Sequence, residues 1–282
     1  MTKQSLSIGN SKRVISMRII RLVGTVFCIC GIIFGAYYII KWQVERDIAA
    51  EQIAVVQETQ TTEVADNNAD IIETDEPKAN PYWDFIKMSM MDVDFTDLKK
   101  LNSDTIGWIK VEGTNINYPF VQASDNDFYL KHTFNRSYNS AGWVYLDYRN
   151  SKNLTNNRNS IIYAHGRYDG SMFGTLKNAL NQKWQKNTNN YVVKISTPES
   201  NTLWQVFSVY RIPTTNDYIK TDFSGNNEFS AFANILTKRS FYDFQTSISP
   251  TDKILTLSTC IGKNNTERMV LHAKLIKVSD KV

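Results

Sequence analysis

An uncharged apolar run near the amino terminus divides this chain of 282 residues into parts that must fold in different surroundings. Residues 22–40 carry no charge, and a helix of that length, rising about 1.5 Å per residue, spans the roughly 30 Å hydrocarbon core of a bilayer. Tyr37, Tyr38 and Trp42 stand at its far end, where interfacial aromatic residues belong. A cleaved signal peptide is the alternative, but the run exceeds a usual signal core and no small-x-small cleavage site follows it. The sequence therefore predicts a transmembrane helix over residues 22–42.

The charges on either side of this run predict its orientation. Residues 1–21 contain five basic residues and no acidic one, so this tail is expected to stay in the cytoplasm and the chain after Trp42 to lie outside the cell. Residues 43–80 carry ten acidic against two basic residues, with few large apolar residues after Val56, which predicts an acidic stalk. Its first part, up to about Val56, can extend the membrane helix, and the remainder is expected to be disordered. Residues 81–282 then form one domain of ordinary size. The net charge of +4 is too balanced to indicate a nucleic-acid partner.

The domain has the composition of a mainly β fold. Two segments with helical spacing of apolar residues, 81–86 and 94–101, come first, followed by short β-rich runs separated by Asn, Asp, Ser and Gly. Eight strands are expected, at residues 107–111, 116–121, 142–146, 160–165, 191–195, 203–210, 253–259 and 268–278. Inserted helices are expected at residues 171–180, 228–237 and 241–244. Eight strands with few intervening helices favour a closed or nearly closed β-barrel.

The cysteines indicate where chemistry could occur. Cys28 and Cys30 lie inside the apolar run, where packing as small hydrophobic residues is expected. Cys260 is the only cysteine outside that run, so it has no partner for a disulfide within its own chain outside the membrane. A lone exported thiol indicates either intermolecular pairing or catalysis.

A cysteine nucleophile needs a proton partner and a group that stabilises the oxyanion. Cys260 ends one expected strand and Arg268 opens the next, so a hairpin would bring them together, and an arginine can both hold an oxyanion and favour a thiolate. His165 ends an expected strand at the barrel rim, where rigid scaffolds present catalytic groups. His132 is expected at the surface and His272 inside the last strand. The pattern alone leaves the role of His165 open between catalysis and structure.

Two motifs stand out, residues 256–260 (TLSTC) with Arg268 downstream, and residues 163–165 (YAH) with residues 171–173 (SMF) downstream. They resemble the two signature regions of class B sortases, which are membrane-anchored cysteine transpeptidases. Further similarity covers most of the region from about residue 83 to 278, and its stretches are residues 102–108, 116–119, 142–147 and 217–223. The chain departs from the family where Ile261 and Gly262 follow the cysteine in place of acidic residues, and where an alanine precedes the histidine.

The resemblance implies a sortase-type eight-stranded closed barrel with two N-terminal helices, and a triad of Cys260 as nucleophile, His165 as acid/base and Arg268 as oxyanion stabiliser. It implies no metal or organic cofactor. Residues that would bind the substrate are Asn117, Val121, Thr214, Tyr218, Ile219 and Ser258.

The implied reaction cleaves a C-terminal sorting signal, such as Asn-Pro-x-Thr-Asn or a Pro-x-Thr-Gly relative, after its threonine. The acyl group would then pass to an amine of a peptidoglycan cross-bridge or stem peptide, or to a pilin lysine. The partners would be Gram-positive surface proteins that carry such a signal. Two alternatives remain at this stage: an exported cysteine protease, in which water is the acceptor and the enzyme a hydrolase, and a non-catalytic binding domain on a membrane tether.

Overall fold

The computed structural model of the chain describes residues 4–58, 61–65, 69–72, 80–261 and 266–281, with side chains at all of these except 4–17, 19, 260 and 261. The chain forms two compact units, Met1–Ile48 and Ala49–Val282.

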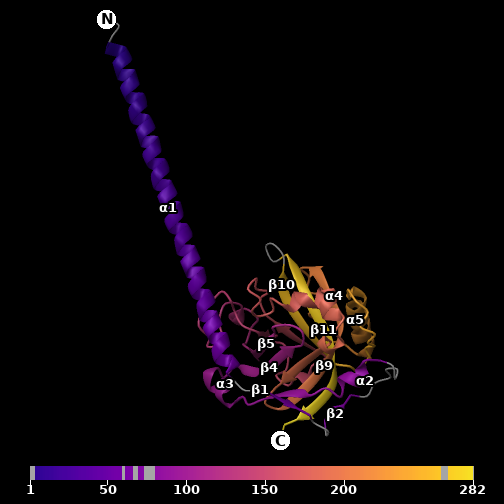
Figure 1. Ribbon diagram of the computed structural model, residues 1–282. Coiled ribbons are helices and arrows are strands. Elements are labelled where there is room, and N and C mark those ends of the chain that lie inside the picture. Colours follow the sequence, from indigo (N-terminus) through magenta and orange to yellow (C-terminus); the bar gives the residue numbers. More distant parts are fainter. Residues whose placement is uncertain (1–3, 59–60, 66–68, 73–79, 262–265, 282) are drawn as a thin grey trace. The chain divides into compact units, whose positions relative to one another are not determined.

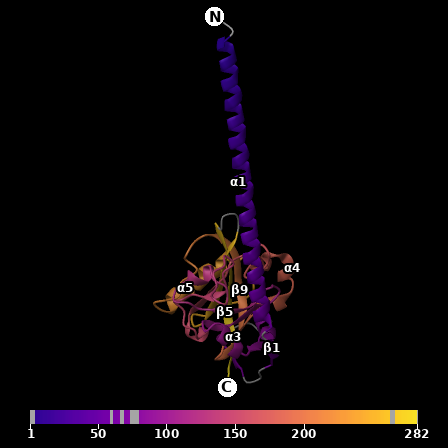
Figure 2. The same cartoon turned by 90° about the vertical axis from the view of Figure 1, so that its left-hand side faces the viewer.

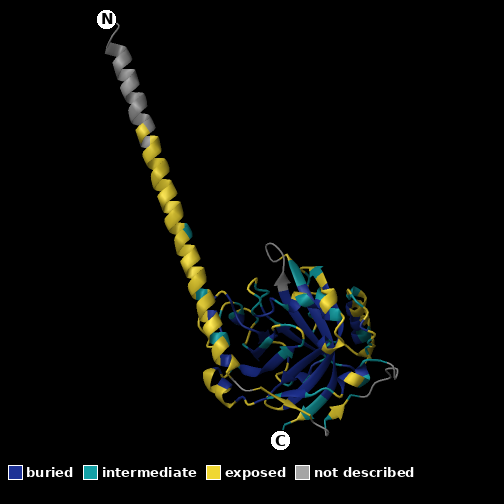
Figure 3. Cartoon of the chain, viewed as in Figure 1, coloured by how far each residue is buried: buried dark blue, intermediate teal, exposed yellow. Residues whose placement is uncertain are grey.

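The first unit is helical. Helix α1 (Gln4–Gln57) contains residues 22–40, and from Ile20 onward it is long and apolar enough to cross a membrane. Phe27 and Ile32 leave 81% and 71% of their surface exposed, and Figure 3 shows this exposure along the helix. Water would be an unfavourable surrounding for so continuous an apolar surface, whereas lipid chains would cover it. The predicted apolar helix is therefore confirmed as an element that could anchor the chain.

The second unit is built on a β-barrel, shown in Figure 1. Its strands are β4 (Thr105–Val111), β5 (Asn117–Val121), β6 (Tyr145–Leu146), β7 (Asn159–Tyr163), β8 (Val192–Ser196), β9 (Ser200–Pro213), β10 (Ile254–Ile261) and β11 (Glu267–Asp280). The order around the barrel is β10-β7-β6-β5-β4-β8-β9-β11, and pairing of β10 with β11 closes it. The β5–β6 and β7–β10 pairs are parallel and the others antiparallel. A strand is present at each of the eight predicted places, but β6 contains only two of the five residues expected for it.

Apolar side chains from these strands fill the barrel. Phe120 is completely buried, and so are the indoles of Trp143 and Trp204, whose N–H groups find acceptors inside the protein. Trp143 donates to the carbonyl oxygen of Pro119 at 2.9 Å, and Trp204 donates to the hydroxyl of Thr202 at 2.8 Å. Figure 3 shows the strands as the buried part of the unit. The barrel is thus a packed core, and a functional site must lie at its ends or on its surface.

Short helices surround the barrel. They are α2 (Tyr82–Phe85), α3 (Thr96–Leu101), α4 (Gln182–Gln185), α5 (Asn226–Arg239) and the 3-10 helices η1 (Phe128–Leu130), η2 (Leu154–Asn156), η3 (Leu176–Leu180) and η4 (Thr188–Asn190). The two helices expected before the barrel are confirmed as α2 and α3, and Figure 2 shows α4 and α5 on opposite sides of the strands. The helix expected at residues 241–244 is wrong. That segment is irregular, because Phe244 is drawn into the core against the ring of Tyr191.

The segment expected to be a disordered acidic stalk is partly ordered on the barrel. Strand β1 (Thr61–Val64) pairs with β3 (Met90–Val93), and β2 (Asp70–Ile71) pairs with β11. The carboxylate of Glu63 contacts the ammonium group of Lys194, which is only 3% exposed. The expectation of disorder rested on how little apolar surface this segment can bury. These strands are instead held by backbone hydrogen bonds to other strands and by an ion pair to the barrel.

A series of buried hydrogen bonds inside the barrel determines the tautomer of His272. The amide nitrogen of Asn159 donates to the carbonyl of Lys220 at 2.9 Å, so its oxygen accepts from Thr256 at 2.7 Å. The hydroxyl of Thr256 therefore accepts from Nδ1 of His272 at 2.9 Å, and Nε2 accepts from the hydroxyl of Tyr210 at 2.8 Å. This arrangement suits a neutral imidazole, and burial lowers the pKa of His272 to about 3.

We expect the folded state to lose stability as the pH falls below 6.5, because His272 then binds a proton in the unfolded chain but stays neutral in the folded chain. This group alone should make unfolding about 1.4 kcal/mol easier at pH 5.5 than at pH 7.5. Denaturant unfolding of the full chain in detergent at both pH values measures the difference. His272→Gln should abolish that part of it, and His132→Gln, at a ring stacked on Phe128, should not. An equal pH effect in wild type and His272→Gln would contradict this expectation.

Candidate active site

Cys260 and Arg268 stand opposite each other on neighbouring strands. Strands β10 and β11 pair as an antiparallel hairpin, and Cys260 is the register partner of Arg268. Cα atoms of such partners lie about 4.5 to 5.5 Å apart. The predicted hairpin is therefore present, although residues 262–265 of its expected polar turn lie outside the described residues. The guanidinium of Arg268 donates to the carbonyl oxygen of Glu267 at 3.2 Å.

His165 reaches the same place from the other neighbour of β10. Strand β7 runs parallel to β10 with Tyr163 as the partner of Ser258, and the backbone N–H of Ala164 donates to the carbonyl of Ser258 at 3.4 Å. The strand ends at Tyr163, two residues before the predicted end, so His165 begins the connection that follows. Position 260 is two residues beyond Ser258, and strand alternation puts both positions on one face of β10. The ends of β7, β10 and β11 thus bring the three predicted catalytic positions together.

Backbone groups orient the imidazole of His165. Its Nε2 lies 2.8 Å from the carbonyl oxygen of Leu130 in η1. A carbonyl only accepts, so Nε2 carries a hydrogen and donates it, and Nδ1 is left for proton exchange. Gly142, at a φ of +60°, leaves room for the ring, since an added Cβ would lie 3.0 Å from Cδ2 of His165. The backbone N–H of Phe173 also donates to the carbonyl of His165 at 3.0 Å.

A cavity of about 400 Å³ lies beside these residues. It is lined by Asn126, Asp127, Leu130, Tyr145, Tyr163, Ala164, His165, Thr215, Asn216, Tyr218, Ile219, Ser258, Thr259 and Arg268. Its walls come from the segment after β5, from β6, β7 and β10, and from the connection between β9 and α5. Among the described residues, no three His, Cys, Asp or Glu side chains gather in a group that could hold a metal ion.

Comparison with known proteins identifies this arrangement. The Sortase domain family model matches residues 109–276. This chain belongs to the sortase family. Sortase B of Staphylococcus aureus is 36% identical over 188 residues, which are 66% of this chain and 75% of that protein. Sortase B of Listeria monocytogenes is 35% identical over 191 residues, covering 64% and 73%. The chain is therefore a class B sortase, a cysteine transpeptidase.

Solved structures agree with this assignment. A Staphylococcus aureus sortase B–substrate complex is 35% identical with a TM-score of 0.59, covering 65% of this chain and 84% of that one. Sortase B from Bacillus anthracis, in complex with AAEK1, is 31% identical with a TM-score of 0.63, covering 85% of this chain and 99% of that one. The closed barrel found here is therefore the sortase fold.

Three of the six residues predicted to bind substrate line the cavity of this sortase. They are Tyr218, Ile219 and Ser258. The hydroxyls of Tyr218 and Ser258 lie 2.9 Å apart, which ties the β9–α5 connection to the strand that carries the cysteine. These three residues therefore line the same cavity as His165 and Arg268.

The other three lie outside the cavity lining. The side chain of Asn117 accepts from the indole N–H of Trp108 at 2.7 Å, and Val121 is completely buried in the core. The backbone N–H and the hydroxyl of Thr214 both donate to the carbonyl of Thr266, at 3.0 and 3.1 Å. Asn117 and Val121 thus support the barrel, and Thr214 joins the β9–α5 connection to the start of β11.

Sequence reasoning missed several residues that the cavity contains. Asn126 comes from the irregular segment after β5, Leu130 ends the 3-10 helix η1 that follows this segment, and Tyr145 and Tyr163 come from strands. The Asp- and Asn-rich stretch around Asn126 could have drawn attention to that segment, because irregular segments at the rim of a rigid scaffold often carry function. The tyrosines gave no such signal, since an aromatic residue in a strand is ordinarily a core residue.

An ion pair lies in the connection that follows His165. The carboxylate of Asp169, in the connection after His165, accepts from Arg167 at 2.7 Å and from the hydroxyl of Ser171 at 2.6 Å. Burial alone would raise the pKa of Asp169, but these bonds outweigh it and lower the pKa to about 2. Burial and the nearby charge of Asp147 raise the pKa of Tyr163, so its hydroxyl stays a donor. The connection after His165 is therefore braced by an ion pair at neutral pH.

Proposed function

We propose that Cys260, His165 and Arg268 act together to cleave a C-terminal sorting signal after its threonine and to transfer the acyl group to an amine. The observation that carries this proposal is the meeting of three strand ends, those of β7, β10 and β11, at one cavity. The sortase family supports the reaction class.

The proposed chemistry has two halves. The thiolate of Cys260 attacks the carbonyl carbon of the signal threonine, and Arg268 donates hydrogen bonds to the oxyanion that forms. His165 then gives the proton on Nδ1 to the leaving amine as the carbon–nitrogen bond breaks, which leaves a thioester. In the second half an acceptor amine attacks the thioester, His165 takes up its proton, and the thiolate leaves. Strand register holds positions 260 and 268 opposite each other. Little movement of the backbone would therefore be needed during the reaction.

The cavity has the character expected of a site for an extended peptide. Leu130 and Ile219 offer apolar surface, the tyrosines offer aromatic surface, and Asn126 offers a polar group. This combination suits a signal such as Asn-Pro-x-Thr-Asn or a Pro-x-Thr-Gly relative, in which proline and polar side chains alternate. The acceptor would be an amine of a peptidoglycan cross-bridge or stem peptide, or a pilin lysine. The product would be a surface protein joined to the cell wall or to a pilus.

The same proposal includes the placement of the enzyme in the cell. Helix α1 would span the membrane, with the basic tail of residues 1–21 in the cytoplasm and the barrel outside, beside the cell wall. Protease added to intact, wall-stripped cells should then remove the barrel. Protection of the barrel would reverse the orientation.

We expect a labelled signal peptide to give two products whose ratio depends on the acceptor. Without an amine, the thioester should be hydrolysed slowly to the free acid. With a peptide amine present, the amide should become the main product, because amine and water compete for one thioester. Mass spectrometry of the products at increasing amine concentration measures this ratio. Free acid alone at every amine concentration would favour a thiol protease, and absence of any turnover, with Cys260 resistant to alkylation, would favour a binding domain.

A further inference from the structure

A buried carboxylate outside the cavity lining contacts several of its walls. Asp147 follows β6, and its side chain is completely buried. It accepts hydrogen bonds from Nε and Nη2 of Arg149 at 2.9 and 2.7 Å, from the hydroxyl of Tyr163 at 3.0 Å and from the side-chain amide of Asn126 at 3.1 Å. This carboxylate therefore joins three side chains from three different segments.

Each of these partners leads to a different wall of the cavity. Tyr163 is the last residue of β7, and Asn126 belongs to the segment after β5. The third wall is reached through Arg149, whose Nη2 also donates to the carbonyl oxygen of Ile219 at 3.0 Å, in the β9–α5 connection. Neither Asp147 nor Arg149 lines the cavity.

We propose that Asp147 and Arg149 are positioning residues that hold three walls of the signal-binding cavity at a fixed separation. This inference rests on the proposed function, in which that cavity receives the sorting signal. The pair does not touch the peptide. It acts through Asn126, Tyr163 and Ile219, which do line the cavity.

The negative charge of Asp147 strengthens its hydrogen bonds to Arg149, Tyr163 and Asn126. Burial alone would raise the pKa of Asp147, but the hydrogen bonds from Arg149 outweigh it and keep the pKa below its usual value. The carboxylate is thus ionised at neutral pH, when its four lone-pair sites can serve several donors at once.

The β9–α5 connection has other anchors, so losing the bond to Ile219 should shift a wall without unfolding it. The hydroxyl of Tyr218 is held by Ser258 at 2.9 Å, and the carbonyl of Lys220 is held by Asn159 at 2.9 Å. A defect in Arg149 should therefore appear in peptide binding more than in stability.

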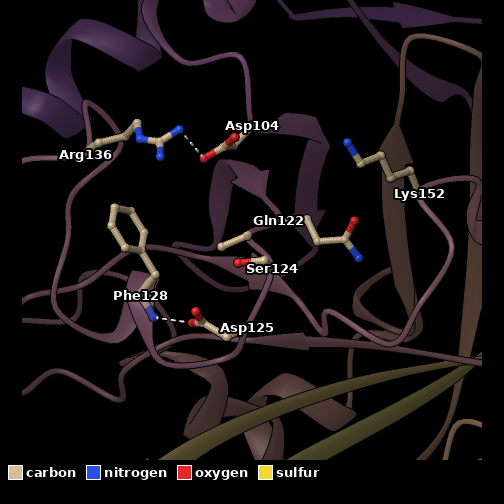
Figure 4. A pocket seen from close by; sticks show the side chains of 8 residues that line it. Asp104, Gln122, Ser124, Asp125, Phe128, Arg136 and Lys152 are labelled. Carbon is tan, nitrogen blue, oxygen red and sulfur yellow. Dashed lines mark hydrogen bonds and ion pairs between the residues drawn. The ribbon is translucent and has the colours of Figure 1, made fainter.

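The chain contains a control cluster around Asp104, and Figure 4 shows the carboxylate of Asp104 beside Arg136. Asp104 accepts from the hydroxyl of Tyr129 at 2.6 Å and from the guanidinium of Arg136 at 2.8 Å, as Asp147 accepts from a tyrosine and an arginine. Asp104 and Arg136 line a separate pocket of about 450 Å³ with Gln122 and Lys152, and that pocket shares no lining residue with the cavity.

The decisive variant is Arg149→Lys, which keeps a positive charge beside Asp147 but cannot hold the carboxylate and the carbonyl of Ile219 together. Losing one hydrogen bond from a charged donor should raise KM for a labelled signal peptide about tenfold. The kcat should stay within about twofold of wild type, and iodoacetamide should alkylate Cys260 at the wild-type rate, because the triad is untouched. Arg136→Lys should leave all three quantities unchanged.

A second pair of variants separates positioning from stability. Asp147→Asn should lower the melting temperature, because its completely buried carboxylate is the partner of Arg149. Asp104→Asn should lower it less, because the ion pair of Asp104 with Arg136 is partly exposed. Only Asp147→Asn should also raise KM. The inference is overturned if Arg149→Lys keeps the wild-type KM, or if Asp104→Asn raises KM as much as Asp147→Asn does. Failure of the proposed function would look different, since the wild-type enzyme itself would then not turn over signal peptides.

Discussion

Cys260→Ala is expected to abolish formation of the acyl-enzyme and to lower turnover of a signal peptide by on the order of 10⁴-fold or more, as loss of a nucleophile does in other enzymes. Alanine has no atom that can attack a carbonyl carbon, so no thioester can form. The backbone should keep its place, because Cys260 lies in the ladder of β10 with Arg268 opposite and the exchange removes only a sulfur atom. Intact-protein mass spectrometry after mixing with signal peptide detects the thioester.

The chain supplies its own control for this experiment. Cys28 and Cys30 are free cysteines in helix α1, outside the barrel. Replacing both by alanine should leave acyl-enzyme formation unchanged, whereas the Cys260 variant should show none at an unchanged melting temperature. Full transpeptidation by Cys260→Ala would remove the nucleophile from the mechanism.

The barrel could be predicted from the sequence because its signals are local. The strands are short β-rich runs separated by stretches that contain Asn, Asp, Ser and Gly, and such runs recur eight times. The strand containing residues 203–210 extends to Ser200–Pro213, since its long pairing with β11 carries it beyond its apolar part. Strands β1 and β2 were missed because their stability comes from partners far away in the sequence, on β3 and β11.

Strand ends and motifs predict the catalytic positions of the candidate site, but they do not predict the walls of its cavity. Cys260 and Arg268 are eight residues apart on one hairpin, so their register follows from local pattern. The walls of the cavity depend instead on the path of irregular segments. Leu130 meets His165 from 35 residues away, and Arg149 meets Ile219 from 70 residues away. The hydrophobic periodicity of the sequence gives no information about such long-range pairs, which form only when the barrel closes.

Arg268→Lys is expected to be far more damaging than conservation of charge suggests. Lysine keeps the positive charge, so it can still favour the thiolate, but it lacks the planar fork of donors that Arg268 can aim at an oxyanion. Removing one such hydrogen bond typically costs about 3 kcal/mol in the transition state, which lowers kcat by roughly a hundredfold or more. KM should change much less, because the oxyanion appears only as the carbonyl is attacked.

Steady-state kinetics on a labelled signal peptide tests this role, comparing wild type with Arg268→Lys and Arg268→Ala. Arg211→Lys is a suitable control, since Arg211 pairs with Glu267 on the adjacent strands and lies outside the cavity lining. If an oriented hydrogen bond to the oxyanion is what matters, the lysine and alanine variants of Arg268 should lie close together and the control near wild type. A lysine variant within about threefold of wild type would mean that Arg268 acts as a general positive charge, because removal of an oriented hydrogen bond to the oxyanion would lower kcat.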